Sequence, residues 1–316
     1  MSIPSSLALL GGLIMAVTGG RGGTASTMLP SESRVDSIRV TIPELGGRTR
    51  MVRIYLPRDY ASSSRAYPVL YLQDGQQLFS PGPFGDWLVD ETMDRLIEAD
   101  PARAMIVVGV DNSPHRWDEY GPWANPDMHA WVDPSWARPG EGGEGAAYVG
   151  FLSGTLKPMI DARYRTLPDR AHTAVGGSSM GGLIALYAGL VHPEVFGKVM
   201  AMSTAVWFAE GGGPWLSDNR LLALVRAHPA PAGVRFYLDV GTAERSRDTD
   251  PDVTDRAGRP VSYPRAYLEG TESVADALRR AGVRPEQLRV VVDTGGIHNE
   301  SAWSTRFAGA LEWLFP

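Results

Sequence analysis

Short apolar runs and longer runs with helical spacing alternate along most of this chain. Runs of four to eight apolar residues are typical of buried strands. Strands that alternate with helices predict helices packed on a mostly parallel sheet, an α/β architecture. The predicted buried strands are Pro68–Leu72, Ala104–Val110, Thr173–Gly176, Lys198–Met202, Val234–Val240 and Leu288–Val292.

Two earlier segments show a different pattern. Arg34–Ile42 and Arg48–Leu56 carry strand-forming residues, and in the second segment apolar and polar positions partly alternate. Gly46-Gly47 between them suits a tight turn. We therefore expect an antiparallel hairpin at an edge of the sheet.

Helices are predicted between the strands from residues that recur at helical spacing. Gly181–Val191 is apolar nearly all round, so this helix should be buried. Pro158 should kink the helix in which it lies, because proline has no N–H and its ring crowds the preceding turn. The predicted helices are Asp86–Ala99, the run from Tyr148 to Ile160, Gly181–Val191, Ser273–Ala281 and Ser301–Leu314.

Two stretches fall outside this alternation. Residues 111–145 show no clear period, and a long insert of this kind usually serves as a lid or a binding loop. Residues 1–30 contain the apolar run Leu7–Val17 followed by small residues, which resembles a secretory signal without its basic start. The alternative is a leader from a misassigned start codon. We expect one catalytic domain over 31–316 and a secreted or periplasmic protein, or a cytoplasmic one if the leader is no signal.

Composition narrows the classes of function. The net charge is −6 with no strongly basic stretch, which argues against a nucleic-acid partner. The chain has no cysteine, which excludes disulfides, thiolate metal sites and a cysteine nucleophile. The apolar run of the leader is too short to span a bilayer, so no stable membrane insertion is expected.

The strongest chemical signal is Gly177-Ser178-Ser179-Met180-Gly181, which fits G-x-S-x-G. It follows a predicted strand and opens a predicted helix, the setting of a nucleophile elbow. There the serine hydroxyl projects from a strained turn, and the glycines allow close backbone approach. Ser179 occupies the central position and is the predicted nucleophile, whereas Ser178 is expected to be structural.

A serine nucleophile needs a base and an acid, which follow it in the order acid, then histidine. Of the six histidines, His298 lies after the last predicted strand and before the last helix, where such a base belongs. Between Ser179 and His298, two residues are candidates for the acid. Asp239 lies within a predicted strand, and Glu244 lies on the loop after Gly241-Thr242, so we favour Glu244 and keep Asp239 as second choice.

Two backbone N–H groups should form the oxyanion hole. One belongs to Met180, after the nucleophile, and the other to the loop after Pro68–Leu72, with Gln76 preferred to Gln77. The acidic run from Asp248 to Asp255 begins like a calcium loop but lacks the glycine and the distal glutamate. A solvated loop is the preferred interpretation, so no metal site is predicted.

With these residues placed, the chain resembles the esterase-D-like branch of α/β hydrolases, which includes enterochelin, feruloyl and acetylxylan esterases. The markers are spread from about Val35 to the C-terminus. They include Val69–Gln76, Arg116 with Glu119-Tyr120, Gly176–Gly182, Ser203 to Trp207, Gly241-x-x-Glu244 and His298.

The resemblance implies an α/β-hydrolase fold and a serine carboxylic ester hydrolase that works through an acyl-enzyme without metal or cofactor. It also implies a pocket beside Trp207. Trp123 of the insert is a candidate aromatic contact for substrate, and Arg116 a candidate polar one, although an ion pair between Arg116 and Glu119 is favoured. The expected substrate is a small or polysaccharide-linked aromatic, acetyl or sugar ester. A siderophore ester and acyl transfer to another alcohol are the alternatives, and oligomeric state is left open.

Overall fold

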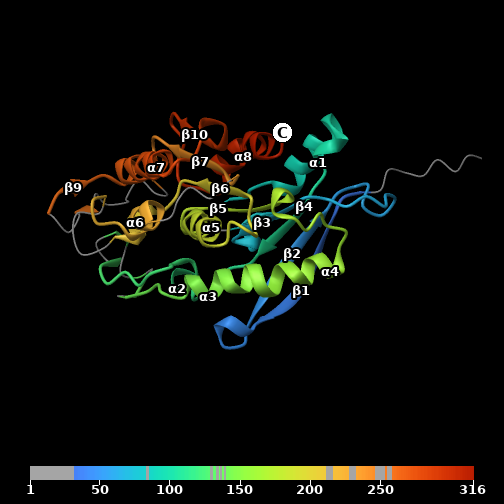
Figure 1. Cartoon of the computed structure of the whole chain (residues 1–316), viewed down its shortest axis with the longest axis horizontal. Coiled ribbons are helices and arrows are strands. Elements are labelled where there is room, and N and C mark those ends of the chain that lie inside the picture. The colour runs from blue at the N-terminus through green and yellow to red at the C-terminus, as the bar shows by residue number, and fades with distance from the viewer. Residues whose placement is uncertain are drawn as a thin grey trace, which may run out of the picture. The chain divides into compact units, whose positions relative to one another are not determined.

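A single twisted sheet organises the described part of the chain (Figure 1). The computed structural model describes residues 32–82, 85–128, 131–132, 135, 137–138, 140–210, 216–227, 233–245, 253–254 and 258–316. The leader and the four aspartates from Asp248 to Asp255 lie outside these residues. Within them, no helix is long and apolar enough to cross a membrane.

The sheet has eight strands in the order β1-β2-β4-β3-β5-β6-β7-β10. Neighbours from β4 to β10 pair in parallel, so the predicted α/β architecture is confirmed. A separate pair, β8 (Val253–Thr254) and β9 (Pro260–Val261), was not predicted. The strands of the main sheet are β1 (Arg34–Ile42), β2 (Arg48–Leu56), β3 (Val69–Gln73), β4 (Ile106–Val110), β5 (Thr173–Ser178), β6 (Lys198–Met202), β7 (Arg235–Gly241) and β10 (Leu288–Asp293).

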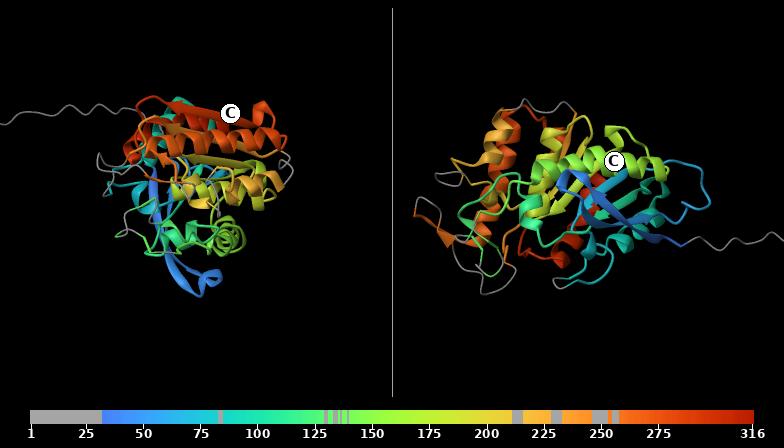
Figure 2. Two further views of the ribbon diagram at one scale, coloured as in Figure 1. Left: turned by 90° about the vertical axis from the view of Figure 1, so that its left-hand side faces the viewer. Right: turned by 90° about the horizontal axis from the view of Figure 1, so that it is seen from below.

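The predicted edge hairpin is confirmed. β1 pairs antiparallel with β2, and β2 continues antiparallel onto β4, which leaves β1 at the edge. Gly46 and Gly47 both have positive φ, 66° and 82°, a conformation that glycine adopts without a Cβ clash. The hairpin extends away from the rest of the domain at this turn (Figure 2).

Helices lie on both faces of the sheet (Figures 1 and 2). α1 packs against α8, and α5 packs on β5 and β6 with α3 and α6 beside it. α5 is buried nearly all round, as predicted. The α-helices are α1 (Val89–Ala99), α2 (Arg116–Tyr120), α3 (Gly145–Gly150), α4 (Lys157–Arg163), α5 (Met180–Val191), α6 (Arg220–Ala227), α7 (Tyr263–Arg280) and α8 (Glu300–Leu314).

One helical stretch runs through α3 and α4 and is irregular where a kink was predicted. Between them, Phe151–Leu156 forms a π-helix, and Pro158 follows in the first turn of α4. A proline lacks the N–H that would close the helical ring and crowds the preceding turn. The wider π turn accommodates both effects, so the irregularity lies just before the proline.

α7 is twice as long as predicted. It begins at Tyr263 with Pro264 in the first turn, and the prediction began only at Ser273. Proline is well tolerated at a helix start, so Pro264 does not prevent the earlier beginning. The buried Ala266, Tyr267 and Val274 then supply the apolar face that holds the helix on the sheet.

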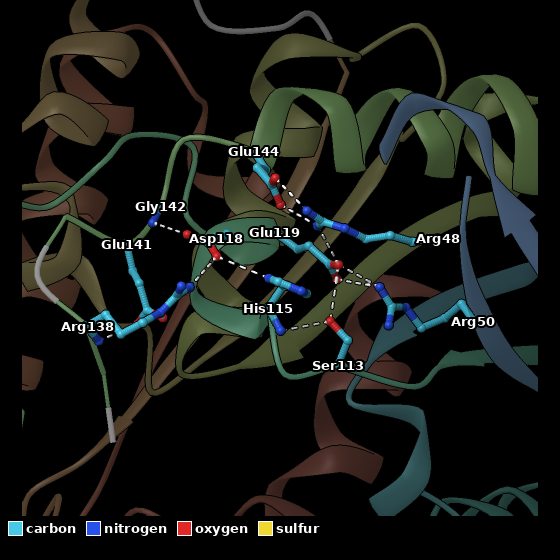
Figure 3. Close-up of polar contacts among 10 residues, drawn as sticks. All are labelled: Arg48, Arg50, Ser113, His115, Asp118, Glu119, Arg138, Glu141, Gly142 and Glu144. Atoms are coloured by element: carbon cyan, nitrogen blue, oxygen red, sulfur yellow. Dashed lines mark hydrogen bonds and ion pairs between the residues drawn. The ribbon is translucent and has the colours of Figure 1, made fainter. Parts of the chain in front are cut away.

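An ion-pair network fixes part of the insert to the hairpin (Figure 3). Glu119 of α2 is 0% exposed, and its two carboxylate oxygens lie 2.6 Å from Nη2 of Arg50 on β2. Arg48 bonds both Glu119, at 3.1 Å, and Glu144, at 2.5 Å. Further out, Asp118 accepts from Arg138 and from the Gly142 N–H. Strand β2 of the hairpin thus anchors α2, and Arg48 of the same strand also binds Glu144 just before α3.

We expect Glu119→Gln to lower the free energy of unfolding by about 3 kcal/mol, because it leaves the buried Arg50 without its counter-charge. Chemical denaturation of the two proteins measures this difference. Glu144→Gln is the matched control, since Glu144 is 35% exposed and such a pair contributes about 1 kcal/mol or less. Equal losses for both variants would contradict the assignment of Glu119 as the main anchor.

Candidate active site

Ser179 lies at a strained turn between β5 and α5. Its backbone has φ 56° and ψ −120°, and α5 begins at the next residue, Met180. A Cβ on Gly177 would lie 2.8 Å from the carbonyl carbon of Gly181, and one on Gly181 would lie 3.0 Å from Cβ of Gln73. A side chain at Gly177 would collide with the backbone of Gly181, so packing requires this glycine, whereas one at Gly181 would press more mildly on Gln73.

The two adjacent serines have different environments. Ser178 ends β5 and is 5% exposed, whereas Ser179 is only partly buried. The main chain of Ser179 is held from β6 and its following loop, because its N–H donates to Met202 O at 2.9 Å and its carbonyl accepts from Ala205 N at 3.1 Å. Ser179 is therefore the more exposed of the two serines, while Ser178 is enclosed in the sheet.

His298 and Glu244 meet at the carboxyl ends of β7 and β10. Nδ1 of His298 lies 2.6 Å from Oε2 of Glu244. The other oxygen, Oε1, accepts from the Gly241 N–H and from the Ser203 hydroxyl, both at 2.6 Å. Burial by itself raises the pKa of Glu244, but His298 and these donors outweigh it and hold the pKa below its ordinary value. An ionised Glu244 makes Nδ1–H the donor, which leaves Nε2 of His298 to act as a base.

Ser203 supports this carboxylate and had no role in the sequence prediction beyond being a marker. Its hydroxyl donates to Glu244 and accepts from Nε1 of Trp303 at 2.9 Å and Nη2 of Arg306 at 3.2 Å. Its φ of 42° is unusual for a residue with a side chain. Its place just after a buried strand was the available signal.

Asp239 lies apart from the histidine and faces a different cation. It is 0% exposed, and Oδ2 lies 3.2 Å from Nε of Arg306. Burial raises the pKa of Asp239 to about 7, and Arg306 offsets this only in part. Of the two acids left open by the sequence, the structure therefore brings Glu244, and not Asp239, to His298.

The predicted oxyanion donors lie on neighbouring loops. β3 and β5 are parallel neighbours, so the loop after β3 and the turn at Ser179 share one edge of the sheet. Met180 is the first residue of α5, where N–H groups have no partner within the helix. The Gln77 N–H donates to Asp74 O at 3.0 Å, which leaves Gln76 as the candidate on this loop.

A residue that the sequence did not single out, Tyr267 of α7, packs against the histidine. Its ring centroid lies 4.5 Å from that of His298. The Ser179 hydroxyl and the Trp207 indole both act to lower the pKa of its hydroxyl. Burial raises the pKa of Tyr267 more than these two groups lower it, so the hydroxyl stays protonated.

The three predicted substrate contacts, Trp207, Trp123 and Arg116, lie in different surroundings and differ in exposure. Trp207 is 1% exposed and stacks on Trp131 with centroids 5.4 Å apart, so it backs the site as a packed ring. Trp123 packs edge-on against Tyr187 of α5. Arg116 of α2 is partly exposed, with its side chain 24% exposed, and it binds Asp74 on the loop after β3.

The predicted ion pair between Arg116 and Glu119 is wrong. Nε and Nη2 of Arg116 bind the two carboxylate oxygens of Asp74 at 2.8 and 2.9 Å, while Glu119 binds Arg50 and Arg48. The two residues are three apart on a short helix, but strand β2 and the loop after β3 offer partners in better geometry. Arg116 is thus fixed beside the oxyanion loop.

Among the described residues, no group of three or more histidine, aspartate and glutamate side chains could hold a metal ion. The polar groups near Ser179 instead form pairs that bond one another, Glu244 with His298 and Asp74 with Arg116. This arrangement suits proton transfer and hydrogen bonding to an acyl group.

Comparison with known proteins decides the family. A family model described as "Putative esterase" matches residues 43–314. The chain belongs to the Esterase family. With that family, it is a carboxylic ester hydrolase of α/β fold.

Individual members of the Esterase family differ in their likeness to the chain. "Uncharacterized protein YbbA" of Bacillus subtilis is 24% identical over 267 residues, which cover 84% of this chain and 92% of YbbA. "Iron(III) salmochelin esterase" of Escherichia coli is 29% identical over 217 residues, 64% of this chain and 44% of that protein. The chain thus spans under half of the salmochelin esterase.

Among solved structures, one titled "ferulic acid esterase" superposes with a TM-score of 0.63 at 22% identity. The match covers 90% of this chain and 98% of the other. At this identity the likeness shows the fold.

Proposed function

We propose that the chain is a serine esterase with Ser179 as nucleophile, His298 as general base and Glu244 as the acid that orients it. The observation that carries the proposal is the 2.6 Å contact between Oε2 of Glu244 and Nδ1 of His298, at the edge of the sheet where Ser179 lies in the turn between β5 and α5. This is the order of groups that activates a serine.

In the proposed reaction, Ser179 Oγ attacks the ester carbonyl carbon and passes its proton to Nε2 of His298. The N–H groups of Met180 and Gln76 stabilise the oxyanion, aided by the N-terminus of α5. The C–O bond to the alcohol then breaks, and the alcohol takes the proton from His298. Water repeats the sequence on the acyl-enzyme and releases the acid, so no metal or cofactor takes part.

For the substrate we propose an ester with an aromatic acid or a sugar-linked acyl group. Arg116 offers a partly exposed cation bound to Asp74 on the loop after β3, and Ile297, next to His298, is 41% exposed. Such a polar and apolar pairing suits a ring that carries hydroxyl groups. A siderophore ester is the alternative, favoured by the 29% identity with the salmochelin esterase. Trp123, packed on Tyr187, remains a candidate contact for a larger substrate.

The test is hydrolysis of p-nitrophenyl acetate and butyrate, followed by methyl ferulate, acetylated xylan and a catecholate trilactone. We expect cleavage of the p-nitrophenyl esters and the highest kcat/KM on one of the ring-bearing esters. Product analysis with added alcohols separates hydrolysis from acyl transfer. Absence of activity on every ester would refute the proposal. We also propose export, on the basis of the leader; processing of the leader in cells would test it.

A further inference from the structure

Asp74, on the loop after β3, ties this loop to the start of the 111–145 insert, although the proposed reaction gives it no role. Its side chain is 13% exposed, and its two carboxylate oxygens bind Nε and Nη2 of Arg116 at 2.8 and 2.9 Å. Nδ2 of Asn112 also donates to Oδ1 of Asp74, at 2.6 Å. Both oxygens are therefore held by side chains of the insert.

The carboxylate of Asp74 does not serve its own turn of helix. Asp74 precedes one turn of 3-10 helix, Gly75–Gln77, and an aspartate in this place usually accepts from the first N–H groups of the helix. Here it makes no such bond. Its backbone is left-handed, with φ 58° and ψ 45°, and its N–H donates to the Tyr120 hydroxyl at 3.2 Å. The side chain thus holds the loop through other segments of the chain.

The loop after β3 lies directly against the turn that carries the nucleophile. A Cβ on Gly181 would lie 3.0 Å from Cβ of Gln73 and 3.5 Å from Oδ2 of Asp74. Gly181 is in the first turn of α5, which begins just after Ser179. Any displacement of Asp74 would therefore move the loop relative to this turn, and the proposed oxyanion donor Gln76 lies on the loop.

Further contacts hold the loop on the side of β4. The Asn112 N–H donates to Oε1 of Gln76 at 3.0 Å. A Cβ on Gly75 would lie 2.6 Å from the carbonyl carbon of Gly109 in β4, so the loop packs directly on this strand. The beginning of the insert, from Asn112 to Tyr120, thus braces the loop after β3.

We propose that Asp74 is a positioning residue, whose bonds to Arg116 and Asn112 hold the loop after β3 where it stabilises the oxyanion. Asp74 acts through the loop and not on the substrate. Donors that are fixed in advance need no rearrangement as charge develops on the carbonyl oxygen. A misplacement of about 1 Å can lower a rate on the order of a hundredfold. The inference rests on the proposed serine esterase with Gln76 as an oxyanion donor.

Two variants test the carboxylate and keep the left-handed backbone, which glycine and asparagine both adopt readily. Asp74→Gly removes every bond of the side chain, and Asp74→Asn leaves one oxygen as an acceptor. We expect kcat on p-nitrophenyl acetate to fall about 100-fold for glycine and about 10-fold for asparagine. Acylation and deacylation both pass through an oxyanion, so KM should change little.

A trifluoromethyl ketone gives a second measurement that needs no turnover. Ser179 Oγ bonds to its carbonyl carbon, the serine proton passes to His298, and the carbonyl oxygen becomes an oxyanion. We expect its dissociation constant, measured by calorimetry, to rise in each variant by the factor by which kcat/KM falls. Thermal unfolding records any loss of stability separately. A purely structural role for Asp74 would not link the affinity for the ketone to kcat.

Asp111→Asn is the matched control. Asp111 binds Nε and Nη2 of Arg53 at 2.8 and 3.0 Å, is 15% exposed and directly follows β4. It should keep both kcat and the affinity for the ketone. Equal losses for Asp111→Asn and Asp74→Asn would overturn the inference, because breaking any such ion pair would then suffice.

Two further outcomes would contradict the role of Asp74. One is a folded Asp74→Gly with wild-type kcat and affinity for the ketone. The other is a rise in KM alone, because Asp74 would then contact the substrate. If Asp74→Gly does not fold, Asp74→Asn decides by the same two measurements.

The ketone also separates this inference from the function on which it rests. A wild-type chain that binds the ketone but cleaves no ester would refute the esterase, and the affinities of the Asp74 variants would still decide the role of this residue. A wild-type chain that neither binds the ketone nor cleaves any ester would overturn both.

Discussion

Ser179→Ala is expected to lower kcat on p-nitrophenyl butyrate by about a millionfold, the scale seen when a serine nucleophile is removed from an intact triad. Alanine keeps the turn but removes the only oxygen that the proposed base can activate. The backbone of Ser179, with φ 56°, is no less strained with a serine side chain than with an alanine side chain. Single-turnover and steady-state assays measure the loss, and mass spectrometry should find no acyl adduct.

Ser178→Ala is the control for this result. The residue is one position away and equally polar, yet it is 5% exposed within β5. We expect it to retain activity. If Ser178→Ala were the inactive variant and Ser179→Ala the active one, the assignment of the nucleophile would have to be reversed.

The sequence predicted the architecture well because buried strands and an apolar helix leave strong local patterns. The central strand β6 and the hairpin strands have the predicted ends, since turn residues bound them. α7 was predicted only in part, and α6 not at all. α6 is short, and the side chain of Asn219 caps it by accepting from two N–H groups at its start. A single-turn cap of this kind is a weak signal in a sequence.

The site was predictable where it follows the order of the chain and not where it depends on packing. Ser179 and His298 lie at strand ends, which fixes their edge of the sheet in advance. Tyr267 reaches His298 only because α7 packs against β7, and nothing in the sequence near Tyr267 indicates this. The error over Arg116 has the same origin. Spacing of three residues on a helix favours a local pair, but Asp74 and the arginines of β2 bind these side chains instead.

Glu244→Gln is expected to lower kcat by about ten-thousandfold. The amide can donate to Nδ1 of His298 where the carboxylate accepted from it, which favours the wrong tautomer of the imidazole and removes the charge that stabilises its protonated form. Because the pKa of Glu244 lies below its ordinary value, the carboxylate is ionised at neutral and mildly acidic pH. The loss should therefore be present across this whole range, as pH profiles of kcat would show.

Asp239→Asn separates a catalytic acid from a buried structural one. Asp239 pairs with Arg306, and that arginine also bonds Asp293 at 2.8 Å. The variant weakens a buried ion pair, so thermal stability should fall while kcat largely remains. Glu244 differs because its second oxygen is already bound by Gly241 and Ser203, which aims the first oxygen at His298. A greater loss of kcat for Asp239→Asn than for Glu244→Gln would mean that the 2.6 Å contact with His298 does not identify the catalytic acid.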